Sequence, residues 1–74
     1  QKKIRKAERD LESCEKKIAD MEARIKELDA MFMKPENASK MELVTEYTDT
    51  KRALDEENER WFKFSEDLES LKNS

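Results

Sequence analysis

The 74-residue sequence predicts an all-α fold in which two long helices form an antiparallel coiled-coil hairpin. Three observations predict it. Glycine is absent and proline occurs once, so the chain lacks the residues that strand-and-turn folds use at positive φ. Hydrophobic residues follow a heptad repeat on both sides of that proline. Charged residues make up 47% of the chain, which is typical of disorder or of a charged helical rod, and the heptad repeat favours the rod.

The first helix is predicted over about residues 2–33. Its apolar or small residues are spaced alternately three and four positions apart, without a break over four heptads, and form a hydrophobic seam. The members of this seam are Ile4, Ala7, Leu11, Cys14, Ile18, Met21, Ile25, Leu28 and Phe32. Oppositely charged residues such as Glu12 and Lys16 stand four positions apart between them and add helix stability of about 0.2–0.5 kcal/mol per pair.

A turn is predicted at about residues 34–38, because Pro35 pushes Lys34 out of the α region. The second helix is predicted over about residues 39–72. Ser39 and Glu42 have the spacing of a capping box, in which each side chain bonds the other residue's backbone amide. Ala38 and Leu43 occupy the positions of a hydrophobic staple, with Ala38 the weaker partner.

The second helix carries a matching seam that is interrupted at Thr50 and Glu57. Its members are Leu43, Tyr47, Thr50, Leu54, Glu57, Trp61, Phe64, Leu68 and Leu71. The short turn makes the two helices antiparallel neighbours within one domain, residues 1–74. A single register satisfies both seams, and it places Ile18 opposite Leu54 and Cys14 opposite Glu57. We therefore expect a monomer; the alternative, a dimer through the same seam, requires the turn to open.

The sequence offers little for catalysis or metal binding. There is no histidine, which removes the commonest general base and metal ligand. Cys14 lies on the seam, where a small buried side chain is expected, so we interpret it as structural. The acidic run of Asp55, Glu56, Glu57 and Glu59 has no loop that could wrap a cation and is interpreted as a solvated face. We predict no catalytic, cofactor or metal site.

The cellular setting is predicted from similar absences. No apolar run approaches the roughly 20 residues that span a bilayer, so no membrane partner is expected. A single cysteine favours a reducing, cytoplasmic compartment. The chain begins within a helical pattern and without an initiator methionine, so we expect it to be a fragment of a larger protein.

Positive charge is concentrated at the start of the chain. The N-terminal basic cluster consists of Lys2, Lys3, Arg5, Lys6 and Arg9. With Glu8 it gives residues 1–9 a charge of +4, although the whole chain carries -3. This cluster is a candidate site for an anionic partner; the alternative is an ordinary solvated helix start. The acidic run is expected to repel a nucleic acid and to confine contact to the open end of the hairpin.

Several apolar residues lie outside the two hydrophobic seams. Trp61 and Phe64 belong to the second seam, whereas Phe62 lies outside it. An off-seam Phe indicates extra packing or an exposed contact. Around the turn, Met31, Met33 and Met41 either cap the end of the hairpin or form an apolar tip for docking onto a partner.

Three stretches resemble a known family. These are Ile18-Ala19-Asp20-Met21-Glu22, then Lys34-Pro35-Glu36, and finally Glu59-Arg60-Trp61 through Leu68-Glu69-Ser70-Leu71. Together they resemble the C-terminal coiled-coil domain of ABC-F ATPases of the Uup-like group, over nearly the whole chain. Glu59-Arg60-Trp61 is the most discriminating match. Lys34 departs from the usual acidic residue before the proline, and Phe64 stands where leucine is commoner.

The resemblance implies a cytoplasmic parent protein with two ATP-binding cassettes, which would use ATP and Mg²⁺. None of the nucleotide-binding motifs lies in this chain, so the chain itself is expected to be non-catalytic and without a cofactor. The family implies binding of DNA, or of RNA on the ribosome, and contact with the parent's cassettes; the few cations of the basic cluster predict that this binding is weak. The alternatives are a structural coiled-coil arm for protein docking, which the net charge of -3 favours, and regulation of the cassettes.

Overall fold

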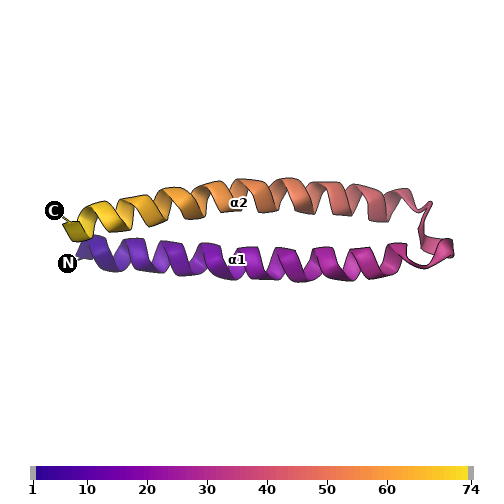
Figure 1. Cartoon of the computed structure of the whole chain (residues 1–74), viewed down its shortest axis with the longest axis horizontal. Helices are drawn as coiled ribbons and strands as arrows, with labels where there is room; N and C mark the ends of the chain where they lie inside the picture. Colours follow the sequence, from indigo (N-terminus) through magenta and orange to yellow (C-terminus); the bar gives the residue numbers. More distant parts are fainter. Residues whose placement is uncertain (1, 74) are drawn as a thin grey trace.

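The computed structural model describes residues 2–73 and consists of two long helices joined by a short turn (Figure 1). Helix α1 spans Lys2–Phe32, the 3₁₀ helix η1 spans Pro35–Asn37, and α2 spans Met41–Asn73. The helices run antiparallel and pack along their length into a rod of 55 × 14 × 14 Å. The start of α1 and the end of α2 lie together at one end, hereafter the open end. The predicted all-α hairpin is confirmed.

The two hydrophobic seams form the contact between the helices. Every seam residue is at least half-buried, as the heptad pattern predicts. Among residues 2–73, only Ala7, Cys14, Leu28 and Glu57 are buried, and Leu28 is the one large side chain with no exposed surface. The other seam residues remain half-buried because two helices cannot surround a side chain on all sides. The core is therefore a narrow line along the rod.

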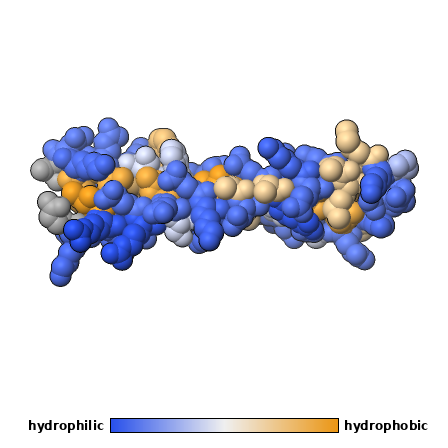
Figure 2. Space-filling model, turned by 90° about the horizontal axis from the view of Figure 1, so that it is seen from below, coloured by the Kyte–Doolittle hydropathy of each residue, from blue (hydrophilic) through white to orange (hydrophobic). Residues whose placement is uncertain are grey.

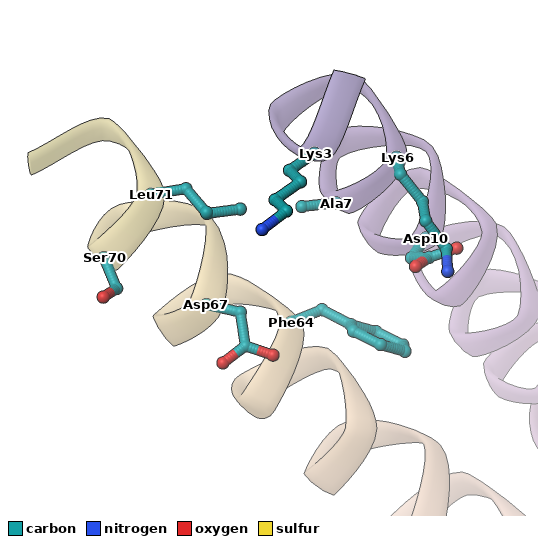
Figure 3. A pocket seen from close by; sticks show the side chains of 8 residues that line it. All are labelled: Lys3, Lys6, Ala7, Asp10, Phe64, Asp67, Ser70 and Leu71. Carbon is teal, nitrogen blue, oxygen red and sulfur yellow. The ribbon is translucent and has the colours of Figure 1, made fainter. Parts of the chain in front are cut away.

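Contacts between the helices agree with the predicted register. Cys14 and Glu57, which are predicted partners, are both buried and line one hollow between the helices. Ala7 and Phe64 line one hollow, as their predicted pairing requires (Figure 3). Near the turn, the Phe32 and Tyr47 rings meet edge to face with their centroids 5.7 Å apart. Such aromatic pairs contribute about 0.5–1.5 kcal/mol beyond the area that they bury.

Asn37 holds the end of α1, a role that no motif in the sequence predicts. The Asn37 side-chain amide donates to the Met31 carbonyl oxygen at 3.0 Å. This bond satisfies one of the carbonyl groups left without a partner at the end of a helix. Lys34 has φ -86° and ψ 125°, the extended conformation expected before Pro35.

The capping box predicted at Ser39 is wrong. Ser39 lies inside a turn in which the Lys40 amide donates to the Asn37 carbonyl at 3.1 Å. Among residues 2–73 the Ser39 hydroxyl finds no hydrogen-bond partner, because the turn removes this residue from the N-cap position. Helix α2 begins at Met41, and the Lys40 carbonyl accepts from the amides of Leu43 and Val44, both at 3.2 Å.

Large apolar side chains remain exposed at the turn and on α2. Met33 is 87% exposed and Met41 is 72% exposed, so these residues do not seal the end of the hairpin. Figure 2 shows apolar side chains at the turn end, as well as in the middle of the rod and at its open end, with hydrophilic side chains around them. Phe62 is 59% exposed, which identifies it as a surface residue, whereas its neighbour Trp61 is half-buried at the interface between the helices.

Leu28→Ala is expected to destabilise the hairpin by about 2–5 kcal/mol, because it removes a fully buried side chain. A core of this size supplies only about 3–5 kcal/mol in total, so the variant should be largely unfolded at 25 °C. Trp61→Ala should cost less, about 2 kcal/mol, since Trp61 is half-buried. Circular dichroism during urea titration measures both, with Met33→Ala as the exposed control. Equal stability of the Leu28 and Met33 variants would contradict the assigned core.

Paired cysteines test the register. In a Cys14→Ser background, Ile18→Cys with Leu54→Cys should form a disulfide within one chain, because the two positions share a layer of the seam. The control pair is Ile18→Cys with Asp55→Cys, whose second cysteine lies on the exposed side of α2. Non-reducing electrophoresis and mass spectrometry at low protein concentration distinguish the products. A covalent dimer as the main product of the first pair would refute the intramolecular hairpin.

Candidate nucleic-acid interface

The N-terminal basic cluster occupies the first turns of α1, and all five side chains are exposed. Residues three, four and seven positions apart share one face of a helix. Accordingly, Lys2, Arg5, Lys6 and Arg9 line one shallow hollow on the surface of α1. The structure therefore brings four of the five predicted site residues together on one face.

Lys3 is directed elsewhere. It lines a second hollow, between the helices, with Ala7 from α1 and with Phe64 and Leu71 from α2 (Figure 3). Lys6 borders both hollows. Asp67 also lines the hollow between the helices, so a carboxylate stands near Lys3 there. Lys3 is consequently the member of the cluster least suited to contact an anion together with the other four.

Carboxylates stand near two members of the cluster, Asp67 near Lys3 and Asp10 near Lys6, but no member forms an ion pair within residues 2–73. Within residues 2–73, the ion pairs involve the cations of Lys17, Arg24 and Arg60, and none involves a member of the cluster. The first turn of α1 also contains no acidic residue.

The most connected charged group lies deeper in the rod. Glu57 is 2% exposed although it carries a carboxylate. It accepts a hydrogen bond from the Arg60 guanidinium at 2.8 Å and lies 3.9 Å from the Lys17 ammonium group. The Cys14 thiol completes its surroundings. Because Lys17 belongs to α1 and Arg60 to α2, this carboxylate joins the two helices at the position where the seam is interrupted.

Titration of this layer is set by burial and by the two cations. Burial alone would raise the pKa of Glu57, but hydrogen bonds from Arg60 and Cys14 and the charges of Lys17 and Arg60 outweigh it and hold the pKa below its ordinary value. Burial raises the pKa of the Cys14 thiol, and the hydrogen bond to Glu57 raises it further. The thiol therefore remains protonated and is a poor nucleophile.

A second ion-pair group ties the helices together nearer the turn. The Arg24 guanidinium donates to both Glu46 carboxylate oxygens, with 2.8 Å to Oε1, and to Glu27 at 2.9 Å. Hydrogen bonding from Arg24 lowers the pKa of Glu46. This bidentate pair fixes the relative positions of α1 and α2, because both guanidinium bonds must form together.

The described residues offer neither a metal site nor a membrane-spanning helix. Between Lys2 and Asn73, no group of three or more acidic, cysteine or histidine side chains is arranged to hold a metal ion. No helix in that range is long and apolar enough to cross a membrane. What the described residues do present is a set of unpaired surface cations at the open end and an apolar tip at the turn.

The fold and its exposed surfaces define a coiled-coil hairpin. The family model described as ABC transporter C-terminal domain matches residues 2–66, and the chain therefore belongs to that family. This match confirms the resemblance drawn from the sequence and identifies the chain as an accessory domain of an ABC protein. Neither the curated proteins nor the solved structures provide a significant match.

The sequence places Glu57 on the seam, where it interrupts the apolar core. Two features of the sequence point to the ion pairs that Glu57 forms with Lys17 and Arg60. Arg60 follows Glu57 by three positions, which brings the two side chains together on a helix. The predicted register also places Lys17 one turn from Cys14, on the side of α1 that borders α2.

Glu57 makes the hairpin sensitive to acid. The pKa of Glu57 is lower in the folded chain than in the unfolded chain, where it is near 4.5. The ionised side chain therefore stabilises the fold fully at pH values above the unfolded-state pKa. This stabilisation is lost as the pH falls through the folded-state pKa. Urea titrations at pH values from 7 to 3 should show falling stability below about pH 4.5. Glu57→Gln should be less stable at pH 7 and should lose less on acidification.

The control for this experiment is Glu56→Gln, which removes the same charge from an exposed neighbour. It should retain most of the acid-induced loss, since Glu46 and Glu57 are unchanged in this variant. If the Glu57→Gln variant and the unmodified chain lose equal stability between pH 7 and pH 3, then Glu57 is not held ionised by its partners.

Proposed function

We propose that this chain is a non-catalytic accessory domain of an ABC-F ATPase and that it binds the phosphate backbone of DNA or RNA. The observation that carries the proposal is the common hollow lined by Lys2, Arg5, Lys6 and Arg9, four exposed cations without an ion pair among the described residues. Phosphate oxygens are the natural partners of such a group, since Arg and Lys neutralise them at close range.

Family membership supports this role. An ABC transporter C-terminal domain accompanies ATP-binding cassettes, and in the ABC-F group such proteins act in the cytoplasm on nucleic acids or ribosomes. ATP and Mg²⁺ belong to the cassettes of the parent protein. The hairpin contributes affinity for the target, and the cassettes contribute the chemistry.

The mode of binding follows from exposed charge alone. Four cations that each neutralise one phosphate of a duplex give a slope of about -3.6 in a plot of log affinity against log salt concentration. Binding should be micromolar or weaker and independent of sequence, because no side chain of the cluster is arranged to read base edges. The overall charge of -3 further weakens binding at low salt.

A second candidate function is protein docking through the turn end. The exposed side chains of Met33 and Met41 favour it, since flexible methionine side chains adapt to many apolar surfaces. In that case the hairpin is an arm whose tip contacts a protein, and the basic cluster only keeps the open end soluble. The experiment below separates the two functions.

Fluorescence anisotropy with a labelled 20-base-pair duplex, and with a hairpin RNA, tests the proposal at 20 to 150 mM salt. The variant Lys2→Gln, Arg5→Gln, Lys6→Gln, Arg9→Gln should lose binding while helicity is retained. The matched control replaces Lys26, Lys34, Lys40 and Lys63 with Gln, which removes the same total charge from exposed positions elsewhere. The control should bind more weakly than the unmodified chain but should keep its salt slope.

Two results would favour protein docking instead. One is the absence of binding to either nucleic acid by the unmodified chain at 20 mM salt. The other is an equal loss of affinity and of salt slope in both quadruple variants, which would mean that net charge, and not the cluster, governs the interaction.

A further inference from the structure

Positive charge on α1 continues beyond the N-terminal basic cluster. Arg9 lines the hollow already described and also a second one, which it shares with Glu12, Ser13 and Lys16. The two hollows thus adjoin at Arg9, which lines both. Lys2, Arg9 and Lys16 are seven positions apart and therefore follow one line along the helix.

This line lies on the side of α1 that faces away from α2. The seam residues Ile4 and Leu11 face α2, and Arg9 lies about half a helical turn away from them around the helix. Lys16 is exposed and has no ion pair within residues 2–73, whereas the adjacent Lys17 approaches Glu57. Of these two neighbouring residues, Lys16 therefore faces solvent and Lys17 contributes to the interface between the helices.

The outer strip, defined as Lys2, Arg5, Lys6, Arg9 and Lys16, is about 21 Å long at 1.5 Å per residue. The first four residues cover only about half of that length. A row of about 21 Å is as long as about six nucleotides of one strand of a duplex, measured along the helix axis. The row from Lys2 to Arg9 is as long as about three. Lys16 therefore reaches phosphates that the N-terminal cluster alone does not.

Acidic residues occupy the opposite side of the rod over the same length. The register places residue 69 level with residue 2 and residue 55 level with residue 16. On α2, Asp55, Glu59, Glu66 and Glu69 are exposed at positions that face away from α1. The rod is 14 Å thick, which exceeds the screening length of about 8 Å at physiological salt. At physiological salt, a nucleic acid on the outer strip is consequently screened from these carboxylates.

We propose that the nucleic acid lies along the outer strip from Lys2 to Lys16, so that the hairpin binds side-on and Lys16 belongs to the interface. The sequence alone predicts contact confined to the open end, because it predicts that the acidic run repels the duplex. Its exposed members lie instead on the far side of the rod, and Glu57 is buried. The inference rests on the proposed function and specifies its geometry.

Single substitutions test this geometry with the same duplex. Side-on binding by five cations gives a salt slope of about -4.5, and Lys16→Gln should reduce its magnitude by about 0.9 while weakening binding several-fold at low salt. Glu12→Gln removes the one carboxylate lining the hollow that Arg9 shares with Lys16, and it should strengthen binding. The control is Lys63→Gln, which removes one positive charge from the acidic side of the rod and should leave the slope unchanged.

The outcomes separate this inference from the function on which it rests. If Lys16→Gln matches the unmodified chain while the quadruple cluster variant loses binding, contact is end-on and the side-on geometry is wrong. If Lys63→Gln and Lys16→Gln weaken binding and reduce the slope equally, bulk charge governs the interaction and the outer strip is not an interface. If the unmodified chain does not bind at all, the proposed function itself fails. Circular dichroism of each variant verifies that the hairpin is intact.

Discussion

The narrowness of the contact between two helices determines most of this structure. Each helix meets one neighbour only, so a side chain can be covered from one side and the core is a single line. Leu28 is the only large apolar residue among residues 2–73 that is wholly enclosed. No third element can compensate for a poor layer, and an unbroken heptad match is therefore the condition for folding. That condition explains why both seams keep their spacing and why charge covers the rest of the rod.

Much of the fold follows from the sequence, because a heptad repeat is a long and redundant signal. The antiparallel order, the seams and the pairing of Cys14 with Glu57 required only spacing and one proline. The turn was harder to predict, since capping depends on the conformation of a few residues. Ser39 has the right chemistry for an N-cap, but the turn that follows Asn37 holds it in the wrong place.

The candidate site was predictable by composition but not by geometry. Counting charges identified the cluster at residues 2–9, and helical spacing accounts for the grouping of Lys2, Arg5, Lys6 and Arg9. The direction of Lys3 depends on its position beside the interface between the helices, which becomes clear when α2 is in place (Figure 3). The burial of Glu57 likewise depends on two cations, Lys17 from α1 and Arg60 from α2. Neither helix alone contains both cations, so the sequence of one helix does not reveal this group.

The buried carboxylate has a mechanical consequence for a rod of this kind. Two helices with a purely apolar seam can slide past each other by one heptad and still pack apolar residues together. Here a slide in one direction would set Glu57 against Ala7, with Asp10 in the place of Lys17. A slide in the other direction would set it against Met21, and either movement would break the bond between Arg24 and Glu46. The charged groups thus resist shear along the axis, so a load applied at the turn is transmitted to the open end.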